Sequence, residues 1–200
     1  TELGMSASQG MHIRDMNATA ADEMPDAAIT MQQANSIYFT GCTFTRLGIN
    51  GLQMINGVQN SLIIGNHFFD ISGNAINIGE PDTGTANAYA QGLNVMKNND
   101  ILNNFIHNIG VDYGSSAAIS VGFASDMDMN HNEIFDTPYS GWHIGYGWNN
   151  RFPNNNKYML LEYNFVHDFM DKDIYDGGAF YILGNTSGES YNYIQHNYIR

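Results

Sequence analysis

The sequence is poor in cysteine, in cations and in proline. Its 200 residues include one cysteine, four prolines and seven Lys and Arg, against 20 Asp and Glu. The single Cys42 excludes an internal disulfide framework and a multi-thiolate metal site. A net charge of −13 argues against nucleic acid, anionic membranes and polyanionic sugars, because such partners require clustered cations. No apolar run reaches the roughly 18 residues of a membrane helix, so we expect no membrane span.

Asparagine is what the sequence has in excess, with 26 Asn beside 21 Gly. One unit recurs along the chain: an Asn, an alternating strand, a turn with a polar residue and a second strand punctuated by glycine. The equivalent first positions are Cys42, Asn66, Asn104, Asn132, Asn164 and Asn197. They are separated by 24, 38, 28, 32 and 33 residues, which indicates a coil of about 24 residues that carries loop insertions.

These repeats predict an all-β fold, the right-handed parallel β-helix. Short strands recur with a period of two and without helical patterns between them, which does not fit a sheet of βαβ units. Stacked coils bury their inward side chains against neighbouring coils. We expect the β-helix to occupy residues 28–200 as part of a longer domain, after an irregular segment over residues 1–27.

The register of the coils follows from the repeats. One inward row is predicted to contain Phe44, Phe68, Ile106, Ile134, Val166 and Ile199. A second inward row is predicted to contain Leu52, Ile76, Ile119, Trp142 and Phe180. The outward row beside it contains Gln53, Asn77, Ser120, His143 and Tyr181. The Asn column should form a hydrogen-bonded ladder from coil to coil.

Aromatic residues gather near the outward row and suit the binding of sugar rings. Coils stack about 4.8 Å apart, so His143 and Tyr181 should be neighbours on one exposed face. The aromatic residues around them in the sequence are Tyr139, Tyr146, Trp148 and Tyr175. Such residues either bind substrate or merely cover the insertions, and the sequence leaves both readings open.

Acidic residues supply the candidates for catalysis. Asp70, Asp136 and Asp168 share one turn position of the repeat, where a side chain that bonds the backbone of the turn is the simplest explanation. Asp136 differs because its turn leads into the aromatic strand. Asp176 precedes Gly177 and Gly178, and two glycines should leave room for a substrate beside the carboxylate. Residues 126–137 lack the Gly and Glu of a calcium-binding loop, so no metal site or cofactor is predicted.

Two segments resemble a known enzyme family. Residues 139–148 read YSGWHIGYGW, and residues 176–184 read DGGAFYILG. They are similar to motifs of glycoside hydrolase family 141, within the pectate-lyase-like superfamily, whose members read HDxxYSGIxVGWGW and DGGAIYTLG. The resemblance runs from about residue 24 to 200. It implies hydrolysis of glycosidic bonds in plant-type glycans by two aspartates on neighbouring coils, which match Asp136 and Asp176. Trp142, His143 and Ile182 depart from the motifs.

Three functions therefore remain open. The first is a secreted or periplasmic glycoside hydrolase, although the segment itself shows no signal peptide. The second is a non-catalytic carbohydrate-binding β-helix of the adhesin or tailspike type. The third is a polysaccharide lyase or epimerase, which the scarcity of Lys and Arg disfavours. In each case the partner is a carbohydrate, with no nucleic acid and no membrane.

Overall fold

The structure, a computed structural model, describes residues 27–79, 95–145, 156–171, 177–183 and 191–200 as strands and connecting turns. In order, the first sheet contains β1 (Ala27–Gln32), β4 (Asn50–Ile55), β7 (Ile76–Ile78), β11 (Ile119–Val121), β14 (Trp142–Gly145) and β17 (Phe180–Leu183). The second contains β3 (Thr43–Leu47), β6 (His67–Ile71), β10 (Phe105–Ile109), β13 (Glu133–Thr137), β16 (Phe165–Phe169) and β19 (Tyr198–Ile199). The third contains β2 (Tyr38–Thr40), β5 (Leu62–Ile64), β9 (Asp100–Leu102), β12 (Ala124–Asn130), β15 (Lys157–Glu162) and β18 (Tyr193–Gln195), while β8 (Met96–Lys97) pairs with β12.

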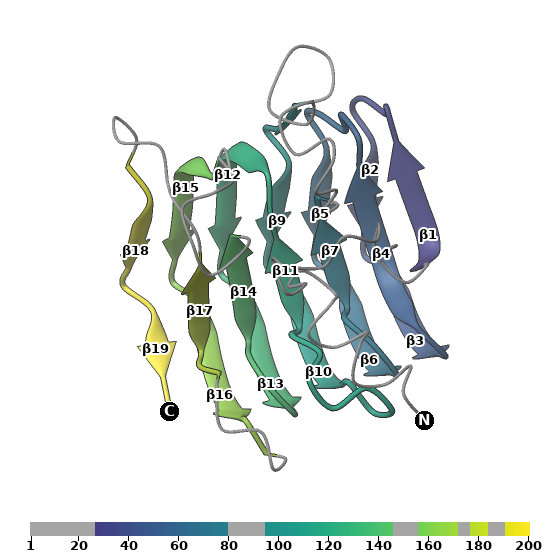
Figure 1. Cartoon of the computed structure of the whole chain (residues 1–200), viewed down its shortest axis with the longest axis vertical. Coiled ribbons are helices and arrows are strands. Elements are labelled where there is room, and N and C mark those ends of the chain that lie inside the picture. The colour runs from purple at the N-terminus through teal and green to yellow at the C-terminus, as the bar shows by residue number, and fades with distance from the viewer. Residues whose placement is uncertain (1–26, 80–94, 146–155, 172–176, 184–190) are drawn as a thin grey trace, which may run out of the picture.

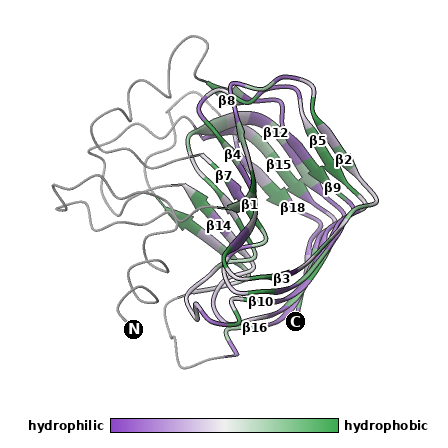
Figure 2. Cartoon of the chain, turned by 90° about the vertical axis from the view of Figure 1, so that its right-hand side faces the viewer, coloured by the Kyte–Doolittle hydropathy of each residue, from purple (hydrophilic) through white to green (hydrophobic). Residues whose placement is uncertain are grey.

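All paired strands run parallel, and each pairs with the equivalent strand of the next coil. The sheets form the three walls of a right-handed parallel β-helix, as predicted, with the coils following one another from β1 to β19 (Figure 1). Figure 2 shows the three walls nearly end-on. No helix in the described segments has the length and apolar character needed to cross a membrane.

The first inward row is confirmed in register and burial. Phe44 pairs with Phe68, Phe68 with Ile106, Ile106 with Ile134 and Ile134 with Val166, and all five are buried. The rings of Phe44 and Phe68 lie parallel with their centroids 4.4 Å apart. Ile199 continues the row beside Val166 on the last described strand, where it is 52% exposed.

The second inward row is confirmed as well. Leu52, Ile76, Ile119 and Trp142 are in register and fully buried, and Phe180 is partly buried beside Trp142. The Trp142 indole Nε1 has no hydrogen-bond partner among the described residues. A buried unpaired donor of this kind costs about 1–3 kcal/mol.

The asparagine ladder forms as predicted. The Asn132 Oδ1 accepts from the backbone N and from the Nδ2 of Asn104, both at 3.0 Å. Asn132 in turn donates its backbone N to the Oδ1 of Asn164 at 2.9 Å. The same pattern links Asn66 to Asn104 and Asn164 to Asn197. The ladder therefore satisfies buried backbone donors at one corner of successive coils.

The two-strand unit read from the sequence omitted the third wall. Several of its strands have only three residues, as in Leu62–Ile64, which are too few to display an alternation of polar and apolar residues. The segment from Asp126 to Asn130, in which polar and apolar residues alternate, belongs to this wall as part of β12.

Candidate functional site

The outward row of the first sheet is polar, and it is buried between its two ends. The register aligns Thr30 with Gln53, then Asn77, Ser120, His143 and Tyr181. From Gln53 to His143 these side chains are buried, and Tyr181 is partly exposed. A row of amide, hydroxyl and imidazole groups on the outer side of a sheet does not add to the apolar core.

Hydrogen bonds connect part of this row. Asn74, in the turn before β7, donates its Nδ2 to the Oδ1 of Asn77 at 2.6 Å and to the Oγ of Ser120 at 3.0 Å. Thr30 donates its Oγ1 to the Oε1 of Gln53 at 3.1 Å. Within the described part of the chain, the Asn77 Nδ2 is a buried donor without a partner. A buried donor of this kind normally forms a hydrogen bond, which a water or a ligand hydroxyl could accept.

Three of the six predicted substrate-binding residues lie together at the C-terminal end of the row. The Tyr181 ring is 5.5 Å from the His143 ring and 5.8 Å from the Tyr139 ring, centroid to centroid. His143 is adjacent to Tyr181 as expected, but its predicted exposure is wrong because it is only 2% exposed. Tyr139 is also buried, and Tyr181 is thus the member of this cluster that solvent reaches most.

The chain that follows Asp176 packs against this cluster. A Cβ at Gly177 would lie 2.8 Å from two ring carbons of Tyr139 and 3.0 Å from the Oγ of Ser140. The two glycines were predicted to leave room for a substrate, but the tyrosine ring fills the space at Gly177. The backbone N of Gly178 donates to the Oγ of Ser140 at 3.3 Å. These contacts hold residues 177 and 178 beside the turn that follows Asp136.

Asp136 lies at the predicted turn column, and the backbone explains that column. The φ angles at the equivalent positions are 57° for Arg46, 56° for Asp70, 49° for Asn108, 52° for Asp136 and 46° for Asp168. Asp and Asn tolerate this left-handed conformation better than most residues. The Asp136 carboxylate is exposed. The shared column is confirmed, and the catalytic role of Asp136 stays a prediction.

Four predicted site residues lie outside the described residues: Asp176, Tyr146, Trp148 and Tyr175. Their roles stay predictions. Among the described residues, no three His, Cys, Asp or Glu side chains gather as a metal ion would require.

A column of stacked rings that was not predicted from the sequence lies on the outer side of the second sheet. Phe69, His107, Phe135 and His167 stack in succession, with centroid distances of 5.5, 4.8 and 4.8 Å and interplanar angles of 12° or less. We call these four residues the ring column. Each occupies the third position after its ladder Asn, so comparing the repeats column by column on the outer face would have revealed it.

Charged and polar groups flank the ring column. The Nε2 atoms of His67 and His107 are 2.9 Å apart, so one ring donates and the other accepts. Burial and the neighbouring His67 lower the pKa of His107, while Asp136 and Glu133 oppose this shift. The hydrogen bond from His167 to Asp168, 2.7 Å between Nδ1 and Oδ2, lowers the pKa of the Asp168 carboxyl.

A solved structure described as "Glycoside hydrolase" matches this chain. The match has a TM-score of 0.71 and 26% sequence identity over 88% of the chain. The chain spans about 30% of the length of that protein. No family model matches the sequence, and no curated protein matches it either. The likeness supports the β-helix fold.

Proposed function

We propose that this chain is part of a glycoside hydrolase that cleaves glycosidic bonds in plant-type polysaccharides or oligosaccharides, with motifs that resemble those of glycoside hydrolase family 141. The observation that carries the proposal is the likeness to a solved glycoside hydrolase across 88% of the chain. The polar outward row of the first sheet, which ends in Tyr181, offers hydrogen-bonding groups and an aromatic ring of the kind that sugars require. Because polymeric glycans occur outside the cytoplasm, we also propose that the protein is secreted or periplasmic.

Asp136 and Asp176 are the proposed catalytic pair. Glycoside hydrolysis needs one carboxyl group as the acid and a second as nucleophile or base. Two neighbouring carboxylates separate each other's pKa values, and this separation assigns the two roles. The packing of Gly177 against Tyr139 supports the pairing, since it holds the residue after Asp176 at the turn that begins just after Asp136.

One observation favours a second candidate, a non-catalytic carbohydrate-binding β-helix. The left-handed φ of Asp136 is shared with Asp70, Asn108 and Asp168, so the backbone alone accounts for an Asx residue at this position. A binding protein would keep the polar row and Tyr181 without requiring Asp136 to meet Asp176.

The same column supplies a matched control for the test. Asp136→Asn, Asp176→Asn and Asp168→Asn would each be assayed on a panel of defined plant oligosaccharides, with thermal unfolding measured in parallel. Asp168 has the same backbone conformation as Asp136 but lies outside the proposed pair. We expect the first two variants to lose roughly 10²- to 10⁴-fold in kcat, and Asp168→Asn to keep its activity.

Full activity in Asp136→Asn would remove Asp136 from the catalytic pair. If the unchanged protein binds oligosaccharides without cleaving any of them, the carbohydrate-binding candidate replaces the hydrolase. Because Asn already occupies this column at Asn108, neither Asp136→Asn nor Asp168→Asn should change the unfolding temperature by more than a few degrees.

A further inference from the structure

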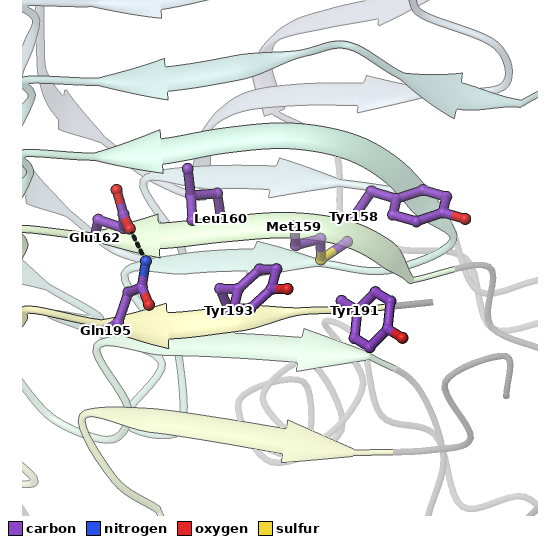
Figure 3. Close-up of a pocket in the computed structure, with 7 residues that line it drawn as sticks. All are labelled: Tyr158, Met159, Leu160, Glu162, Tyr191, Tyr193 and Gln195. Carbon is purple, nitrogen blue, oxygen red and sulfur yellow. Dashed lines mark hydrogen bonds between the residues drawn. The ribbon is translucent and has the colours of Figure 1, made fainter. Parts of the chain in front are cut away.

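A hollow of about 400 Å³ lies on the outer side of the third sheet, away from the first-sheet row. It is formed by the neighbouring strands β15 and β18 and by Tyr191, which precedes β18 (Figure 3). The register places Leu160 beside Tyr193 and Glu162 beside Gln195, so outward side chains of both strands contribute to the hollow. We call it the tyrosine hollow.

One end of the tyrosine hollow is aromatic and open to solvent. Tyr158, Tyr191 and Tyr193 are 49%, 67% and 51% exposed. The rings of Tyr191 and Tyr193 are inclined by only 23°, with centroids 6.2 Å apart, as in an offset pair. The ring column differs because each of its rings lies 4.8–5.5 Å from the next, which leaves little ring face free. The tyrosines retain surface on which a ligand can lie.

The other end of the tyrosine hollow is polar. Gln195 donates its Nε2 to the Oε1 of Glu162 across the two strands (Figure 3). Glu162 is two residues from Leu160 along β15, which separates the polar end from the aromatic end by about 7 Å. An aromatic surface beside a carboxylate and an amide matches a sugar ring, whose C–H face is apolar and whose rim carries hydroxyls.

The charges and ring geometry select among ligands. Glu162 and the net charge of −13 disfavour an anionic sugar. Lys157 places its Nζ 5.8 Å from the Tyr158 ring centroid, which already supplies that ring with a cation. An aromatic cage for a quaternary ammonium needs rings that enclose the ligand, whereas Tyr191 and Tyr193 are nearly parallel. A neutral sugar ring fits both features.

We propose that the tyrosine hollow is a second carbohydrate-binding site, which holds a neutral glycan without cleaving it. Glu162 is the one carboxylate that lines the hollow among the described residues, and hydrolysis by the two-carboxylate route needs two. The choice of a saccharide rests in part on the proposed function, but the residues are separate from the proposed catalytic pair. The site would keep a chain attached to the protein while the first-sheet face acts on another part of it.

Calorimetric titration of the Asp136→Asn protein tests the proposal, because this variant allows binding to be measured without turnover. The probes are xylotetraose, cellotetraose, tetragalacturonate and tetramethylammonium. We expect a neutral tetrasaccharide to bind, and Tyr193→Ala to weaken one class of site by roughly 5- to 30-fold. Tyr193→Phe should retain binding, because the stacking surface remains.

Tyr38→Ala is the matched control. Tyr38 occupies the same outward row at the other end of the third sheet and is 62% exposed, but it lies outside the hollow. Its removal should leave binding unchanged. Equal affinity in Tyr193→Ala, no saturable binding of either neutral probe, or binding of tetramethylammonium or tetragalacturonate alone would each overturn the proposal.

The outcome is separable from that of the proposed function. Activity of Tyr193→Ala on short soluble substrates should match that of the unchanged protein, because the hollow takes no part in bond cleavage. A protein that cleaves glycans but shows no loss of binding in Tyr193→Ala would refute the second site and leave the hydrolase intact. Tyrosine-dependent binding without cleavage would do the reverse.

Discussion

The outer faces of the first and second sheets belong to the same coils, yet they carry opposite kinds of column. On the second sheet, the ring column repeats an aromatic or imidazole ring at every step from Phe69 to His167. On the first sheet, the outward row changes chemistry along the stack, from the amides of Gln53 and Asn77 through the hydroxyl of Ser120 to His143 and Tyr181. Each ring of the ring column stacks on a ring in the adjacent coil, whereas most side chains of the first-sheet row lie beside a side chain of different chemistry.

This difference separates stability from function within a solenoid. A column of like side chains gains energy from each nearest-neighbour contact, as the rings and the ladder amides do. A column of unlike polar side chains gains little from stacking, and burying it costs free energy unless hydrogen bonds form. The first-sheet row is therefore where we look for binding and chemistry, and the repeating columns are where substitutions should affect stability.

The largest loss of stability is expected in the repeating apolar row beneath the ring column. Phe68 is fully buried between Phe44 and Ile106. Phe68→Ala should reduce the free energy of unfolding by about 3–5 kcal/mol, because it removes a stacked ring and leaves a cavity. Urea denaturation followed by circular dichroism measures this change. A loss below about 1 kcal/mol would mean that the coils do not depend on this row.

A smaller loss is expected in the ladder. Asn132→Ala removes the acceptor of the Asn104 backbone N and the donor to the Ile101 carbonyl, which lies 2.9 Å from the Asn132 Nδ2. Buried groups left unpaired in this way cost about 1–3 kcal/mol. Asn35→Ala is a suitable control, because its side-chain bond to Ser36 is exposed and its backbone is not left-handed. Equal effects of the two substitutions would contradict a stabilising role of the buried ladder.

The fold was predictable from the sequence because a stacked fold repeats its constraints. The column from Asn66 to Asn197 and the row from Phe44 to Val166 recur at equivalent positions, so each coil confirms the register of the others. The third wall was missed because strands such as Leu62–Ile64 are too short to show a pattern.

The candidate site was less predictable, since a functional residue need not recur. The neighbours of Tyr181 were correctly inferred from the register, but the burial of His143 was not, because alternation gives the direction of a side chain and not what covers it. The tyrosine hollow was not predicted because two of its tyrosines lie in the third wall, which the repeats did not reveal. The third tyrosine lies beside that wall.

Replacement of an aromatic residue by leucine on each face compares the two faces directly. Phe135→Leu keeps an apolar side chain but removes the stack between His107 and His167, and should lower the free energy of unfolding by about 0.5–1.5 kcal/mol per ring contact without changing activity. Tyr181→Leu should instead reduce kcat/KM on oligosaccharides, by roughly 5- to 30-fold. Activity assays and thermal unfolding on both variants provide the comparison. Loss of activity in Phe135→Leu alone would reverse the roles of the two faces.

The smallest effect concerns the pH dependence of the ring column. Burial and His67 lower the pKa of His107 below its usual 6.5, so the unfolded chain takes up this proton more readily than the folded one. Stability from this source is therefore complete above pH 6.5 and declines as the pH falls through that value toward the lower pKa of the folded state. His107→Phe keeps a ring between Phe69 and Phe135 but cannot be protonated, so its unfolding temperature should fall less steeply between about pH 7 and pH 5.5. The difference between the slopes of unfolding temperature against pH in the two proteins separates the effect of His107 from that of the carboxylates. Asp168, for example, has a lowered pKa, so its contribution to stability declines at more acidic pH. Identical slopes would show that the proton on His107 does not distinguish the folded from the unfolded chain, and that the ring column acts through packing alone.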